Sequence, residues 1–169
     1  MDMKKPEASA PSLDDLYAKP GHLIRRCQQI ATAIFLEETS GFGITPVQYA
    51  ALTAVARYPS IDATRLSQLV AFDRSTLGDV LERLEQKKLV KRTSGSQDRR
   101  IKKISLTPAG RDLLTAIESA VDRAQERILE PLPPEEQRAF VELLKRVVHI
   151  NNALSRAPQT ATGLEVGDS

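Results

Sequence analysis

The feature that most constrains the fold is a connection of only three residues, 71–73, between two segments with helical periodicity. The first segment follows Asp62, an N-cap residue type, and the second follows Asp73 in the same way. In both segments apolar residues recur three and four positions apart, which places them on one helix face. They are Leu66, Leu69 and Val70, and then Leu77, Val80, Leu81 and Leu84. The sequence therefore predicts two short helices joined by a tight turn.

The residues that follow this pair change from helical to strand periodicity. Two short segments, LVKRTSG and RIKKISL, flank a Ser- and Gly-containing stretch at residues 94–97. Ile101, Ile104 and Leu106 supply the apolar positions of the second segment. Strand-like segments around a stretch of this kind predict a β-hairpin.

Further helices are expected on both sides of this region. Thr45-Pro46 combines a cap residue with Pro at the first helical position, Gln48 closes a capping box, and the helix should run to Arg57. Longer amphipathic helices are expected at residues 21–40, 107–130 and 134–156. The unpatterned residues 1–12 and 157–169 are expected to be disordered tails around a single domain, residues 13–156.

The composition agrees with a mainly helical fold. Of the 169 residues 41% are hydrophobic, but only 4% are aromatic and none is Trp. A core of Leu, Ile, Val and Ala suits helices better than a β-sandwich. We therefore expect a mainly α fold with a small β-wing. Because two short helices joined by a tight turn and followed by a hairpin form a winged helix-turn-helix, residues 45–106 should form such a lobe, and the longer helices, whose apolar stripes a small lobe cannot cover, a dimerisation region.

Several classes of protein receive no support from the sequence. The N-terminus lacks the apolar core of a signal peptide, and no stretch approaches the roughly 18 apolar residues of a membrane span, so a cytoplasmic protein without membrane contact is expected. The single Cys27 excludes an internal disulfide and an all-Cys metal site. With two His, no Gly-rich phosphate loop and no Ser-His-Asp set, we expect neither an enzyme nor a cofactor or metal.

Positive charge is concentrated around the predicted hairpin. The formal net charge is only +2, yet residues 87–103 contain eight basic residues and one acidic residue. The rest of the chain has 16 basic and 21 acidic residues. This asymmetry is typical of a surface that contacts a phosphate backbone, although a merely solvated face produces the same pattern.

The second helix of the tight pair fits the requirements of a DNA recognition helix. Such a helix needs polar side chains at its N-terminal end and an apolar face that holds it to the protein. Polar side chains stand at the first turn and along the outward face of residues 74–88: Arg74, Ser75, Thr76, Asp79 and Arg83. Arg74 is the best candidate for guanine readout, because its fork can bond O6 and N7 together.

The hairpin would lie over the adjacent minor groove, where insertion of Arg is favoured. Arg99 or Arg100 is the expected inserted side chain, and Asp98 would hold a neighbouring guanidinium in one rotamer. The other basic side chains would contact phosphates: Lys91, Arg92, Lys102 and Lys103. The expected partner is therefore double-stranded DNA.

Three segments of the chain resemble the MarR family of bacterial transcription regulators. DRRIKKISLTPAG matches the family's wing signature, RSTLGDVLERLEQKKLVKR looks like its recognition helix, and GITPVQYAAL looks like its second helix. The resemblance covers residues 21–156 and implies a homodimer whose first, fifth and sixth helices intertwine, repressing transcription from a pseudo-palindromic operator. The apolar stripes of the three longer helices favour a dimer independently, since a small lobe cannot cover them.

The resemblance also implies a small-molecule effector. Family members typically bind small aromatic acids between the dimerisation helices and the DNA-binding lobe. The candidate contacts here are His22, Arg25, Arg26 and Tyr49, a set that suits a ring bearing a carboxylate. Ion pairs and core packing are the alternative roles of these side chains. The stretch GHLIRRCQQIATAIFLEE is similar to regulators of nicotinic acid catabolism, which implies a hydroxylated nicotinate.

Two other interpretations of the chain stay open. One branch of the family senses peroxide through a lone Cys in the first helix, but that position corresponds to Gly21 here. Cys27 falls on the apolar stripe instead, so we expect it to be a buried structural thiol. The other interpretation is a winged-helix protein-interaction module without DNA binding, which would not need a basic wing.

Overall fold

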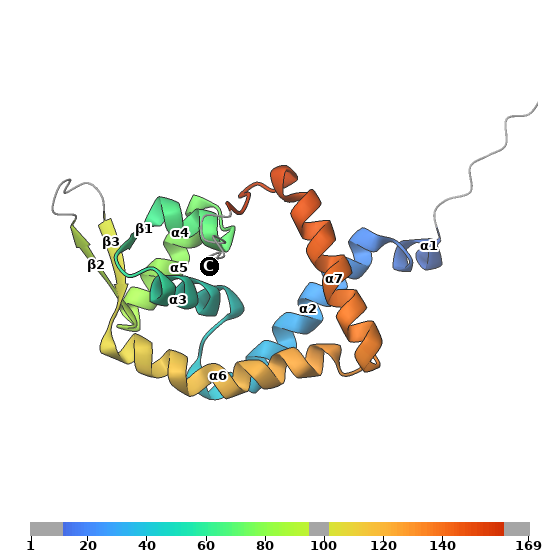
Figure 1. Ribbon diagram of the computed structural model, residues 1–169, viewed down its shortest axis with the longest axis horizontal. Coiled ribbons are helices and arrows are strands. Elements are labelled where there is room, and N and C mark those ends of the chain that lie inside the picture. The colour runs from blue at the N-terminus through green and yellow to red at the C-terminus, as the bar shows by residue number, and fades with distance from the viewer. Residues whose placement is uncertain (1–11, 95–101, 161–169) are drawn as a thin grey trace, which may run out of the picture.

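The computed structural model describes residues 12–94 and 102–160 (Figure 1). The elements in chain order are α1 (Leu13–Tyr17), α2 (Pro20–Glu38), η1 (Ser40–Phe42), α3 (Pro46–Arg57), β1 (Ile61–Asp62), α4 (Ala63–Val70), α5 (Arg74–Gln86), β2 (Val90–Ser94), β3 (Lys102–Leu106), α6 (Pro108–Leu129), α7 (Pro134–Ile150) and η2 (Asn152–Leu154). This mainly helical fold with a small sheet confirms the expected fold class. No helix in the two described ranges combines the length and apolarity needed to cross a membrane.

The helices α3 and α6 begin where the sequence signals predict. In the capping box of α3, the backbone N of Gln48 donates to Thr45 Oγ1, and the backbone N of Thr45 donates to Gln48 Oε1, both at 3.3 Å. The side chain of Thr107 caps α6 by accepting from the backbone N of Gly110 at 3.0 Å. These bonds satisfy backbone donors that have no partner within the helix.

The sheet has three antiparallel strands in the order β1-β3-β2. The strands β2 and β3 form the predicted hairpin, in which Val90 pairs with Leu106 next to the lobe. β1 adds its two residues to the other edge of β3, with Ile61 opposite Ile104. β1 was not predicted, because two residues are too few to show strand periodicity.

One hydrophobic core joins α3, α4, α5, α6 and the sheet. Its most enclosed large apolar side chains are Ile44, Leu52, Leu66, Leu84, Ile104, Ile117 and Val55. The predicted apolar face of α5 is buried in full: Leu77, Val80, Leu81 and Leu84. We call residues 44–117, as far as they are described, the lobe, and the hairpin of β2 and β3 that projects from it the wing.

The start of α6 fixes the base of the wing to the lobe. Thr107 Oγ1 donates to the carbonyl oxygen of Lys88 at 2.7 Å. A Cβ added at Gly110 would lie 2.1 Å from the carbonyl oxygen of Leu89, so only Gly permits this close approach of helix and strand. The base of the wing is therefore held by a side-chain hydrogen bond and by close main-chain packing.

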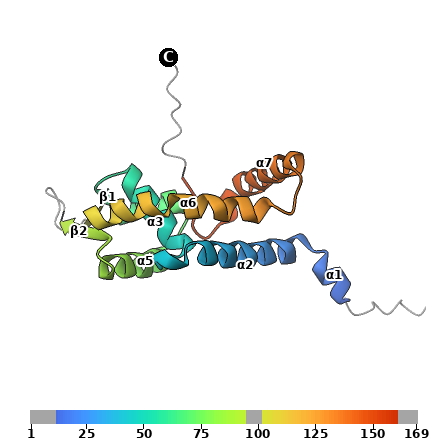
Figure 2. The ribbon, with the colours of Figure 1, turned by 90° about the horizontal axis from the view of Figure 1, so that it is seen from below.

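A cluster of ion pairs fixes α2 to α6, which run side by side (Figure 2). Arg127 contacts Glu38 at 2.5 Å and Glu37 at 3.2 Å, and Arg123 contacts Glu38 at 3.0 Å. Hydrogen bonds from Arg127 and then Arg123 hold the pKa of Glu38 below its ordinary value. The C-terminal end of α2 is thus tied to α6, whereas its N-terminal half extends away from the lobe.

The elements α1, α7 and residues 20–30 of α2, which we call the arm, have no buried residue. Large apolar side chains on the arm are exposed, among them Leu13, Leu23, Ile24, Ile30, Leu143, Leu144, Val147 and Val148. Figure 1 shows α7 turning back from the end of α6 toward the lobe. The arm therefore carries apolar surface that residues 12–94 and 102–160 of its own chain leave uncovered.

The ends of the chain differ from the expectations. Residues 13–17, for which no helix was predicted, form α1 with a capping box between Ser12 and Asp15. The last helix ends at Ile150, six residues before its predicted end, because Asn151 Nδ2 donates to the carbonyl oxygen of Val147 at 2.8 Å and closes the helix. The expected tail from residue 157 is wrong for residues 157–160, which lie against α4.

Candidate nucleic-acid interface

The tight turn between α4 and α5 forms as the sequence predicts. Ala71 adopts a left-handed backbone (φ 54°, ψ 40°), and its N–H donates to the carbonyl oxygen of Ser67. Asp73 then begins α5, because its carboxylate accepts from the backbone N and from the Oγ1 of Thr76, both at 2.9 Å. These two bonds hold the pKa of Asp73 below its ordinary value. The first turn of α5 is consequently ordered without being buried.

The polar face of α5 is open to solvent. All five predicted contact residues of the helix are exposed: Arg74, Ser75, Thr76, Asp79 and Arg83. They lie on one side of a helix whose other side is fixed in the core. The Thr76 hydroxyl already donates to Asp73, so toward a ligand it can only accept a hydrogen bond.

Gly78 also lies on this exposed face and was not singled out from the sequence. A Cβ at this position would meet nothing within 4 Å, so packing does not require Gly. Gly inside a helix costs about 1 kcal/mol relative to Ala. Its presence leaves the backbone of α5 accessible to close approach by a ligand surface. The signal in the sequence was an interior Gly among helix-forming residues.

The phosphate-contact candidates on the wing differ in their partners. Arg92 Nε pairs with Glu85 Oε2 of α5 at 3.1 Å. Lys103 Nζ approaches Asp62 Oδ2 at 3.9 Å. DNA would have to compete with these carboxylates, whereas Lys91 is exposed and forms no ion pair within the described residues. The expected wing-tip contacts Asp98, Arg99 and Arg100 lie outside the described residues.

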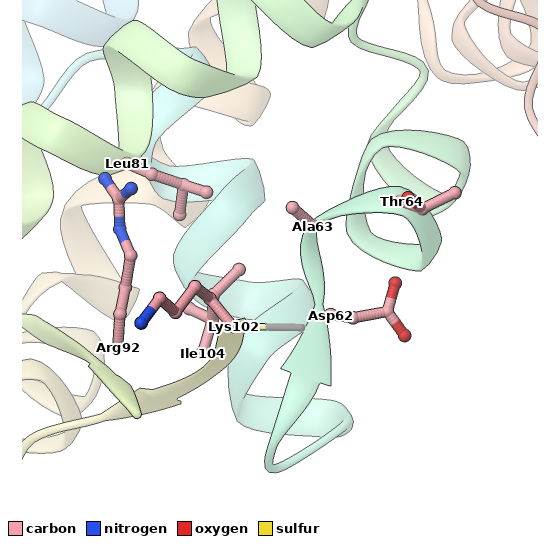
Figure 3. A pocket seen from close by; sticks show the side chains of 7 residues that line it. All are labelled: Asp62, Ala63, Thr64, Leu81, Arg92, Lys102 and Ile104. Atoms are coloured by element: carbon pink, nitrogen blue, oxygen red, sulfur yellow. The ribbon is translucent and has the colours of Figure 1, made fainter. Parts of the chain in front are cut away.

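A pocket of about 460 Å³ lies where the wing meets the lobe (Figure 3). It is lined by Asp62, Ala63, Thr64, Leu81, Arg92, Lys102 and Ile104. Two cationic side chains, Arg92 and Lys102, reach it from the wing, and Lys102 Nζ also donates to Ser94 Oγ at 3.0 Å. The wing therefore presents positive charge on its inner face as well as at Lys91.

Comparison with known proteins identifies the family of this fold. A family model described as MarR family matches residues 42–101, which include α3, α4, α5 and β2. The transcriptional regulator HosA of Escherichia coli O157:H7 is 31% identical over 131 residues, 78% of this chain and 96% of HosA. The chain belongs to the MarR family. The HTH-type transcriptional repressor NicR of Pseudomonas putida is 30% identical over 152 residues, 88% of this chain and 96% of NicR.

Solved structures agree with this assignment. A probable transcriptional regulator from Pseudomonas aeruginosa superposes with a TM-score of 0.75 at 33% identity, covering 78% of this chain and 98% of that one. The repressor CouR, solved bound to a 23-mer DNA duplex, gives a TM-score of 0.74 at 25% identity, covering 83% of this chain and 99% of CouR. BpsR of Bordetella bronchiseptica, whose DNA binding is described as regulated by 6-hydroxynicotinic acid, gives a TM-score of 0.72 at 29% identity. The match covers 77% of this chain and 93% of BpsR. As its relatives are, this MarR-family protein is a transcriptional regulator and not an enzyme.

The four candidate effector contacts do not meet within one chain. His22, Arg25 and Arg26 lie near the start of α2, where Arg25 Nη2 is 3.5 Å from His22 Nδ1. Tyr49 is half-buried on α3, and its ring centroid is 5.9 Å from that of Phe35. Phe35 is ten residues beyond Arg25 on α2, or about 15 Å along the helix axis at 1.5 Å per residue. One small ligand cannot touch both groups in a single chain.

Cys27 is exposed, so the expectation of a buried thiol is wrong for the single chain. The stripe pattern correctly places Cys27 beside apolar residues of α2, including Ile24 and Ile30, but these side chains are exposed too. Residues 23–30 of α2 are all exposed, so no element among the described residues buries Cys27.

Proposed function

We propose that this MarR-family regulator is a ligand-responsive repressor that binds a pseudo-palindromic DNA operator as a homodimer. The observation that carries the proposal is the first turn of α5, where Arg74, Ser75 and Thr76 are exposed beside a buried apolar face. A helix of this kind can enter a major groove about 12 Å wide without disturbing the core. The CouR duplex complex and the repressor name of NicR support the assignment.

The homodimer rests on the exposed apolar side chains of the arm. Burial against a second copy removes this surface from water, at roughly 25 cal/mol for each Å² of apolar area. A two-fold pair places the two copies of α5 in successive major grooves, about 34 Å apart. Operator half-sites would then be spaced by about one helical turn.

The DNA contacts divide into base readout and phosphate binding. Arg74 reads guanine, while Ser75 and Thr76 contact bases or phosphates. Arg99 or Arg100 enters the minor groove, held by Asp98. Lys91 binds phosphate directly, and Arg92, Lys102 and Lys103 do so after exchanging their intramolecular partners.

The effector is an aromatic acid, and its site is completed by the partner subunit. In one chain the cations of α2 and Tyr49 are too far apart to share a small ligand, so a second copy must supply one group. BpsR, regulated by 6-hydroxynicotinic acid, supports a hydroxylated nicotinate. The acid releases DNA only if it binds better to dimers whose α5 spacing does not fit the operator.

Fluorescence anisotropy on a labelled fragment from upstream of the protein's own gene tests this function. If the dimer neutralises about eight phosphates, log affinity should fall with log salt at a slope near −7. One member of a panel of aromatic acids should reverse binding, and Arg25→Ala should abolish that reversal but leave DNA affinity unchanged. Arg100→Glu should abolish DNA binding in a folded dimer, and binding that survives this change would contradict the wing assignment.

The exposure of Cys27 favours one alternative effector mechanism, oxidation of this thiol. Addition of peroxide in the same assay distinguishes oxidation of Cys27 from binding of an aromatic acid. Release by peroxide in the wild type but not in Cys27→Ser, together with no release by any acid, would replace the aromatic-acid proposal. Binding to no DNA at all would favour the protein-interaction module.

A further inference from the structure

The last described residues of the chain cap the first helix of the helix-turn-helix. Helix α4 ends at Val70, so its final carbonyl groups have no partner within the helix. The backbone N of Thr160 donates to the carbonyl oxygen of Gln68 at 3.2 Å, and Gln159 Nε2 donates to that of Leu69 at 3.0 Å. Residues far away in sequence thus satisfy α4 next to the turn.

This C-terminal segment is itself closed into a defined shape. Asn152 Nδ2 donates to the carbonyl oxygen of Gln159 at 2.8 Å, and the backbone N of Gln159 donates to Asn152 Oδ1 at 2.8 Å. The side chain of Asn152 thereby exchanges two hydrogen bonds with the backbone of Gln159 and closes the residues between them into a loop. We call residues 151–160 the brace, because they run from the end of α7 to α4 (Figure 1).

The brace brings one cation to the start of the recognition helix. Arg156 lines a surface pocket of about 340 Å³ together with Phe72, Asp73 and Arg74. Its side chain is exposed and forms no ion pair with another described residue. The charge of Arg156 adds to the lowering of the Asp73 pKa, so the two groups attract each other, but they form no ion pair, and the two oxygens of Asp73 accept from Thr76. Arg156 and Arg74 therefore place two positive side chains beside the N-terminal end of α5.

We propose that Arg156 is an additional DNA-backbone contact, which the brace holds beside the first turn of α5. The ligand is a phosphate group flanking the bases read by Arg74, so the inference rests on the DNA binding proposed above. The N-terminal end of α5 adds a partial positive charge at the same place. Because the brace fixes the backbone around Arg156, less conformational entropy is lost when the contact forms.

Salt titrations of DNA affinity test this contact on two 30-bp duplexes, one from upstream of the protein's own gene and one of random sequence. Arg156→Ala should weaken binding about 5-fold per arginine, roughly 25-fold per dimer at about 0.15 M salt, and make the salt slope shallower by about 2. The affinity for the two duplexes should fall by the same factor, because phosphate contacts carry no sequence information. Arg138→Ala, on the exposed surface of α7, is the matched control and should change neither quantity.

Two further variants separate the charge of Arg156 from the shape of the brace. Arg156→Lys keeps the charge and should keep the salt slope. Asn152→Ala opens the brace and should lower affinity by roughly 2- to 5-fold at an unchanged slope, since the charge remains available. Wild-type affinity and slope in Arg156→Ala would overturn the proposal, and so would an equal loss in Arg156→Lys. A wild type that binds neither duplex would instead refute the DNA-binding function itself.

Discussion

Helices α5 and α7 are both amphipathic, but only one of them is covered by its own chain. α5 buries four of its 13 residues, while α7 buries none of its 17. The apolar face of α5 meets the core of the lobe, whereas that of α7 meets solvent. The difference shows that the apolar faces of the lobe are covered within one chain, while the exposed apolar face of the arm supports the proposed dimer, in which a second copy covers it.

The largest expected effect comes from a charge placed on the uncovered face of the arm. Leu143 is 58% exposed in the single chain, so Leu143→Asp should leave the lobe folded but prevent dimer formation. Operator affinity should fall by roughly 10²- to 10⁴-fold, because the two half-sites are then bound independently. Light scattering after size exclusion gives the oligomeric state. Lys145→Asp, on the opposite side of α7, is the control and should stay dimeric.

Truncation of a core side chain in the lobe should have the opposite effect, because it lowers the stability of the fold rather than preventing dimer formation. Leu52 is 0% exposed, so Leu52→Ala should lower the free energy of unfolding by about 2–5 kcal/mol through lost burial and a residual cavity. Urea titration followed by circular dichroism measures this loss. Leu154→Ala, at an exposed position of η2, provides the comparison and should change stability by less than about 0.5 kcal/mol. Equal losses in the two variants would contradict the placement of Leu52 in the core of the lobe.

Within the lobe, Gly78 should separate stability from function. Gly78→Ala should raise the free energy of unfolding by about 0.5–1 kcal/mol, because a Cβ meets nothing in the free protein. The same methyl group should weaken operator binding if DNA approaches the backbone of α5 there. Thermal unfolding and anisotropy measure the two effects. A variant that is more stable and binds equally well would show that DNA does not approach Gly78.

The smallest effect concerns the pH dependence of the Asp73 cap. Since the pKa of Asp73 is lowered in the folded protein, its stabilising contribution is fully present above the ordinary Asp pKa of about 3.9 and is lost as the pH falls through the lowered value. Asp73→Ala should therefore be less stable than the wild type at neutral pH, and the gap should narrow below about pH 4. Denaturant unfolding at several pH values measures this gap. A constant gap down to pH 2 would show that the carboxylate does not act through its charge.

Local signals were enough to predict most of the lobe. Cap residues such as Thr45, Asp73 and Thr107 mark helix starts through bonds to their own neighbours, so the sequence contains both partners. The buried face of α5 follows from residue spacing alone. The same spacing identifies the polar face of α5, which carries five of the predicted DNA contacts.

Features that depend on distant partners could not be predicted in the same way. The exposure of Cys27 was missed because spacing shows that a residue lies on an apolar stripe, but not whether another element covers the stripe. The brace was not predicted: residues 151–156 were expected to continue the last helix and residues 157–160 to belong to a tail, whereas residues 157–160 acquire their order from Asn152 and α4 rather than from local periodicity. Separation of Arg25 from Tyr49 likewise appears only when α2 is placed against α3.

The most direct test of the account is a methylation-protection footprint of the protein on DNA from upstream of its own gene. Guanine N7 lies in the major groove, where the two copies of α5 are proposed to bind. The account predicts two protected guanine clusters, related by two-fold symmetry and centred about 10–10.5 bp apart, with the signal in each lost in Arg74→Ala. A single protected cluster, or protection unchanged by Arg74→Ala, would contradict the paired recognition helices.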